Sequence, residues 1–69
     1  MEVIRDYKGR VVCKANASDG HIEIKYRSLT IRATVGIGDT YTVERESIIT
    51  EVTRTSESHF SVSSYQRSA

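Results

Sequence analysis

Residues 21–35, HIEIKYRSLTIRATV, alternate between apolar and polar side chains almost without exception. Ile22, Ile24 and Tyr26 share one parity, and charged residues stand between them. Because successive side chains leave a strand on opposite sides, this period of two is typical of a strand with one buried and one wet face. The same alternation recurs along the chain, so the sequence predicts an all-β domain.

The buried set changes parity inside this stretch. Apolar side chains occupy even positions up to Tyr26 and odd positions from Leu29 onwards. A straight strand cannot do this, because a shift of one residue sends every side chain to the other face. Either a β-bulge or sharp bend, or a tight hairpin turn, must therefore interrupt the chain at Arg27 and Ser28. Two-residue hairpins favour Gly or Asn, so we expect the bulge or bend.

Turn residues divide the rest of the chain into short strands. Gly9, the run NASDG at residues 16–20 and the pair of glycines in residues 36–39 are the clearest turns. A single helical turn at residues 45–47 is the most helix that the composition allows. We expect five to six strands in a small antiparallel barrel or sandwich, with residues 1–65 as one domain and 66–69 as a disordered tail.

The chain is too small to bury much apolar surface. It has 69 residues, of which 38% are hydrophobic, with no Trp and one Cys. A domain of this size reaches a stability of about 3–5 kcal/mol, and pairing with a second copy would add buried surface. Cys13 shares parity with Val11 and Ala15, which indicates a small core residue with no disulfide partner.

Catalytic and cofactor chemistry find little support in the sequence. Gly36 and Gly38 lack the third glycine and the helix of a dinucleotide site. His21 and His59 show no metal-ligand spacing. We also expect a ~70-residue barrel to lack room for a ligand pocket of about 300 Å³ or more. The predicted protein is non-enzymatic, with no metal, no cofactor and no small-molecule substrate.

Charge suggests one binding function. The whole chain carries a net charge of +1, but the basic residues are concentrated in its first half. A basic sheet face with aromatic rings is how small barrels bind single-stranded nucleic acid, since cations follow phosphates and rings stack on bases. The candidate residues for this function are Lys14, Lys25, Tyr26, Arg27 and Arg32.

The last predicted strand suggests another function. Residues 58–65, SHFSVSSY, carry no Lys, Arg, Asp or Glu, and Phe60, Val62 and Tyr65 are their large side chains. An uncharged edge strand offers free backbone groups to a partner's sheet or to a second copy. Alternatively, this strand closes the barrel against residues 1–7. We expect a protein-binding module as the main function, with nucleic-acid binding as the alternative.

Three further expectations concern the setting of the protein. The lone Cys13 and the lack of a signal peptide favour a reducing, cytoplasmic environment. No apolar run approaches the ~20 residues that cross a membrane, so no membrane partner is expected. A short β protein rich in Ser and Thr also suits a bacteriophage or mobile-element product that occupies the surface of a host protein, although no motif supports this origin.

Overall fold

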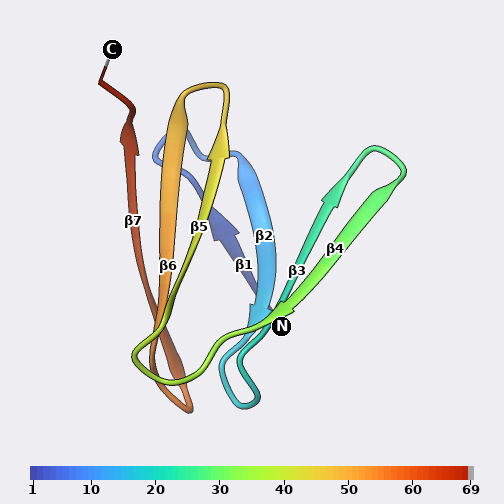
Figure 1. Cartoon of the computed structure of the whole chain (residues 1–69), viewed down its shortest axis with the longest axis vertical. Coiled ribbons are helices and arrows are strands. Elements are labelled where there is room, and N and C mark those ends of the chain that lie inside the picture. The colour runs from blue at the N-terminus through green and yellow to red at the C-terminus, as the bar shows by residue number, and fades with distance from the viewer. Residues whose placement is uncertain (69) are drawn as a thin grey trace.

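The computed structural model describes residues 1–68, which form seven antiparallel strands in two sheets (Figure 1). The strands are β1 (Glu2–Arg5), β2 (Val11–Asn16), β3 (His21–Tyr26), β4 (Leu29–Thr34), β5 (Thr40–Arg45), β6 (Ile48–Ser56) and β7 (His59–Gln66). The first sheet has the order β1-β2-β3-β4 and the second has the order β5-β6-β7. The predicted all-β antiparallel class is confirmed, with seven strands instead of five to six.

The extra strand comes from residues 21–35, which fold as a hairpin and not as one bulged strand. The last pair of the β3–β4 ladder joins Tyr26 to Leu29, so Arg27 and Ser28 form a two-residue turn. Such a turn pairs even positions of β3 with odd positions of β4 on the same face, which explains the change of parity. The expected bulge is wrong because Arg27 adopts a φ of 57°, a left-handed conformation that is uncommon for a side chain of this type.

A second tight turn replaces the helical turn expected at residues 45–47. Arg45 pairs with Ile48, and the two residues between them, Glu46 and Ser47, have φ values of 53° and 67°. Positive φ at both central positions is the requirement of a type I′ hairpin turn, whose twist matches that of the flanking strands. Residues 1–68 contain no helix, and therefore no helix that is long and apolar enough to cross a membrane.

The two sheets pack face to face over one core. Ile4, Cys13, Ala15 and Ile22 come from the first sheet and meet Val52 and Phe60 from the second, together with Ala17 and Val35. The register between β1 and β2 shifts after Ile4, which leaves Val12 as the extra residue of a bulge. Val12 therefore packs against the core, whereas Val11 lies opposite Arg5 and is 44% exposed. Cys13 and Ala15 share the core face, as predicted. The prediction that Val11 lies on the same face is wrong, because the bulge at Val12 shifts the alternation.

Arg54 ties the second sheet to the loops of the first. Its Nε donates to the carbonyl oxygen of Ala17 at 2.8 Å, and its two terminal nitrogens donate to the carbonyl oxygens of Val35 and Ser18 at 3.2 and 3.1 Å. These carbonyl groups belong to the β2–β3 turn and to the link between the sheets. One guanidinium therefore fixes three backbone positions outside its own sheet.

The two ends of the chain meet through side chains. In the part of the chain that the structure describes, β1 and β7 share no ladder, so the barrel closure considered above does not occur. Instead, the backbone amide of Tyr7 donates to Ser64 Oγ at 3.1 Å. β7 runs to Gln66, and the Arg67 amide donates to the Ser47 carbonyl at 2.7 Å, so residues 66–67 of the expected tail are bonded. Residue 69 of that tail lies outside the described residues.

Candidate functional site, an apolar groove beside the β5 edge

The β3–β4 hairpin extends beyond the second sheet and keeps part of its inner face uncovered. In Figure 1 the hairpin diverges to one side, away from β5, β6 and β7. Tyr26, Leu29 and Ile31 lie on the same face as the buried Ile22, yet they are 48%, 56% and 40% exposed. Side chains with the parity of core residues are thus open to solvent at the tip of the hairpin.

These side chains form one wall of a groove. Ile24, Tyr26, Leu29 and Ile31 line it from the hairpin, and residues 41–45 line it from β5, with the buried Ile48 and Thr50 also contributing. The hollow has a volume of about 510 Å³. The expectation that so short a chain leaves no hollow of ligand size is therefore wrong, because the hairpin stands apart from the second sheet instead of closing over it. We call this hollow the β5 groove.

The second wall of the β5 groove is the edge of a sheet. Five consecutive residues of β5 line the hollow, whereas a strand that presented only one face would contribute every second residue. β5 pairs with β6 on one side and with no other described strand on the other. Its outer N–H and C=O groups are therefore available for pairing beside an apolar face.

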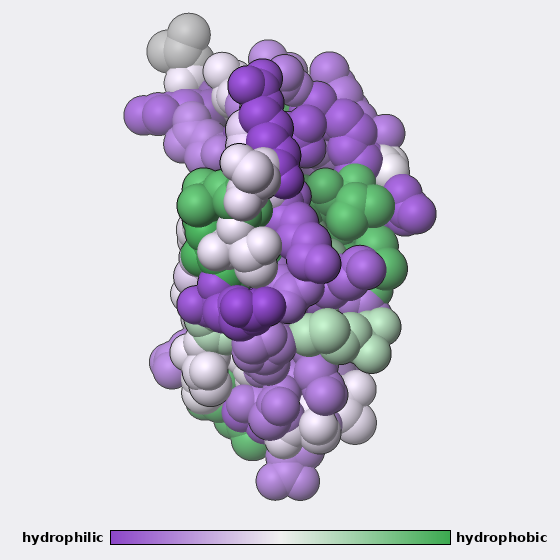
Figure 2. All heavy atoms as spheres, turned by 90° about the vertical axis from the view of Figure 1, so that its right-hand side faces the viewer, coloured by the Kyte–Doolittle hydropathy of each residue, from purple (hydrophilic) through white to green (hydrophobic). Residues whose placement is uncertain are grey.

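The space-filling view also shows apolar side chains on the side of the molecule where the hairpin lies. Figure 2 faces the side of the molecule on which the hairpin stands, and apolar side chains reach the surface there in patches separated by a strip of polar ones. The side of the molecule that carries the hairpin therefore exposes apolar side chains within a mainly hydrophilic surface.

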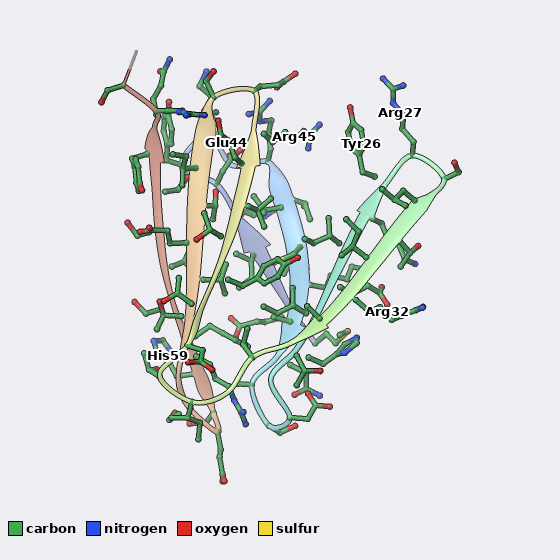
Figure 3. The ribbon with its side chains drawn as sticks, viewed as in Figure 1. Tyr26, Arg27, Arg32, Glu44, Arg45 and His59 are labelled. Carbon is green, nitrogen blue, oxygen red and sulfur yellow. The ribbon has the colours of Figure 1, made fainter. Side chains whose placement is uncertain are left out.

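Tyr26 holds two cations at one end of the β5 groove. The guanidinium carbon of Arg27 lies 5.4 Å from the centre of the Tyr26 ring, and that of Arg45 lies 5.3 Å from it. Figure 3 shows Tyr26 and Arg45 pointing toward one another from β3 and β5, with Arg27 at the hairpin turn. Both distances are within the ~6 Å range of a cation–π interaction.

Neither of these arginines forms an ion pair within residues 1–68. The carboxylates at this end of β5 are bound elsewhere: Glu44 by Arg67 at 2.9 Å, and Glu46 by Arg10. The hydrogen bond and charge of Arg10 lower the pKa of Glu46, so this carboxylate is ionised and engaged at neutral pH. The charge of Arg45 also contributes to this lowered pKa, but Arg45 itself has no carboxylate within ion-pair distance in the described chain.

The residues predicted for nucleic-acid binding lie on two different faces of the first sheet. Lys14 and Arg32 stand on the outer face, on either side of Glu23, whereas Tyr26 belongs to the inner face. Glu23 pairs with Arg32 at 3.3 Å and with Lys25 at 3.8 Å, which reduces the charge of that outer face. The predicted set therefore divides into two groups. Lys14, Lys25 and Arg32 gather around Glu23 on the outer face. Tyr26 and Arg27 lie together at the hairpin turn, and Arg32 points away from them (Figure 3).

The residues predicted for a protein interface are also divided. Phe60 is 3% exposed and belongs to the core. Val62 pairs with Val52 on the inner face and is 42% exposed at the sheet edge. Tyr65 lies on the outer face, where its hydroxyl donates to Glu51 at 3.3 Å, and burial together with this carboxylate raises its pKa. β7 presents Val62 and Tyr65 on opposite faces, so they do not form one patch with Phe60.

Cys13 and the two histidines lie in surroundings that are typical of structural residues. Cys13 is 2% exposed, and burial raises the pKa of its thiol to about 11, with a contribution from Glu2. His21 and His59 begin separate strands in different sheets. Residues 1–68 contain no group of three or more His, Cys, Asp or Glu side chains placed to hold a metal ion.

Sequence reasoning missed most residues of the β5 groove. Tyr41, Val43 and Arg45 share a parity, and this pattern places Arg45 on an otherwise apolar face. The sequence alone therefore indicates that Arg45 lies on this face. The cation–π contact of Arg45 could not be predicted in this way, because it depends on the position of Tyr26 in the other sheet. Comparison with protein-family models, with curated proteins and with solved structures gave no match for the chain.

Proposed function

We propose that this protein is a binding module that accepts an extended strand of another protein in the β5 groove. The observation that carries the proposal is the exposed apolar face of the β3–β4 hairpin beside the unpaired edge of β5. Backbone pairing with β5 supplies affinity, and apolar side chains at alternate positions of the guest strand pack on the hairpin and supply specificity.

The number of strands supports this mode of binding. The first sheet has four strands and the second has three. Paired strands lie about 4.8 Å apart and packed sheets about 10 Å apart. A fourth strand next to β5 therefore lies over the inner face of the hairpin, where it covers Leu29 and Ile31.

A peptide titration followed by NMR tests the proposal. The probe is a peptide with blocked ends and the sequence TQTVTVT, whose two valines fall opposite Val43 and Tyr41 when the glutamine is opposite Arg45. We expect shifts of the β5 amides and of the Leu29 and Ile31 methyl groups. Leu29→Ser should weaken binding about fivefold, because a leucine contact of roughly 1 kcal/mol is lost.

Thr30→Ser is the matched control for Leu29→Ser, because Thr30 is the next residue of β4 and belongs to the outer face. It should leave the affinity unchanged. The proposal fails if a millimolar concentration of the peptide shifts no groove residue. Shifts confined to β7 would instead assign binding to that edge, and light scattering that shows a stable dimer through the groove would make a second copy the guest.

A further inference from the structure

We propose that the guest strand carries an aspartate or glutamate side chain, and that this carboxylate binds between Arg27 and Arg45 beside Tyr26. This inference rests on the proposed function, since it specifies the partner of the same groove. It starts from the two guanidinium groups that lie near one ring, 5.4 and 5.3 Å from its centre, and that form no ion pair in the described chain.

The position of Arg45 determines where on the guest strand the acid falls. Arg45, Val43 and Tyr41 lie on the inner face of β5, opposite Ile48, Thr50 and Val52. Directly opposed residues of paired strands point to the same face. A guest strand therefore places its acid opposite Arg45 and its apolar side chains opposite Val43 and Tyr41.

The Tyr26 ring holds the two guanidinium groups in a defined arrangement. Its ring attracts both guanidinium groups through its face, which restricts where their N–H groups can point. Each guanidinium still has free donors, and a carboxylate is the planar acceptor that matches their geometry. Bringing a negative charge here also relieves the repulsion between two like charges at one ring.

Charge argues for a foreign strand over a second copy of this chain. Among the edge strands, β4 and β7 contain no acidic residue, and the glutamate of β5 is already bound by Arg67. β1 contains Glu2, but this strand is four residues long. The free edges of a second copy thus offer little to the cationic end of the groove.

The experiment compares two peptides with blocked ends, TETVTVT and TQTVTVT, by NMR titration at low salt. We expect the glutamate peptide to bind about fivefold more tightly, which is the range of a partly exposed charge pair. Arg45→Gln should abolish this preference while the glutamine peptide still binds. Raising the salt concentration to 0.5 M should also reduce the preference, because mobile ions screen exposed charges.

Arg32→Gln is the control for charge alone, because Arg32 lies on the outer face and pairs with Glu23. It should leave the preference intact. If both peptides bind equally well in the groove, the acid site is overturned and the strand-binding function stands. If neither peptide shifts groove residues, the strand-binding function itself fails. Stronger binding of a single-stranded oligothymidylate at Tyr26, Arg27 and Arg45 would overturn the peptide assignment in favour of nucleic acid.

Discussion

Cys13 couples the stability of the protein to alkaline pH. Its thiol is buried in the core, and burial raises its pKa to about 11, above the ordinary value near 8.5. The thiol form is compatible with the folded state, and the thiolate favours the unfolded state. The contribution of this group to stability is therefore complete below about pH 8.5 and is lost as the pH rises toward 11.

This dependence is measurable by urea unfolding between pH 8 and 10.5. We expect the free energy of unfolding of the unmodified chain to fall more steeply with pH than that of Cys13→Ala, because alanine has no proton to lose. Other groups titrate in the same range, but they are common to both proteins. Parallel profiles would contradict the burial of the thiol.

The turn between β5 and β6 contains a strained backbone conformation at Ser47. Ser47 has a φ of 67°, and a non-glycine residue in this region costs about 1–2 kcal/mol. Ser47→Gly should raise the free energy of unfolding by roughly 0.5–1 kcal/mol, since relief of strain exceeds the entropy that glycine adds to the unfolded chain. Thermal and urea unfolding would both record the gain.

Ser28→Gly provides the comparison, because Ser28 lies in the two-residue turn between β3 and β4 and has no positive φ. Here glycine relieves nothing and adds flexibility to the unfolded chain, so stability should fall by about 0.5 kcal/mol. An equal gain at both positions would mean that the backbone strain at Ser47 is not the cause.

Strand positions could be predicted from the sequence, but the connection between two of them could not. Alternation placed residues 21–35 and 58–65 in strands, because each sheet has a buried and a wet face, but it counted β3 and β4 as one bent strand. The hairpin at Arg27 was missed because a left-handed arginine contradicts the usual preference of such turns for glycine or asparagine. Likewise, the pairing of Arg45 with Tyr26 joins different sheets, and the period of two carries no information on how sheets are placed.

At the scale of the whole molecule, Arg54 joins the second sheet to the loops of the first. Lysine keeps the charge of this residue but cannot present three donors in one plane. Arg54→Lys should therefore lower the free energy of unfolding by about 2 kcal/mol, as two charge-assisted hydrogen bonds to carbonyl groups are lost.

Urea unfolding followed by circular dichroism gives this value directly. Arg32→Lys is the control, since Arg32 is exposed and makes a single surface ion pair with Glu23, and its effect should stay within about 0.5 kcal/mol. A similar loss in the two variants would show that Arg54 contributes no more than a surface charge.

The order of the strands has a consequence for how the chain reaches its native state. Every ladder joins strands that follow one another in sequence, and residues 35–39 form the single connection between the sheets. Each half of the chain can therefore assemble its own meander from nearby segments, without a search for distant partners. The one long-range encounter left is the docking of two nearly complete sheets, so the slow step of folding should be their collision and the exclusion of water between them.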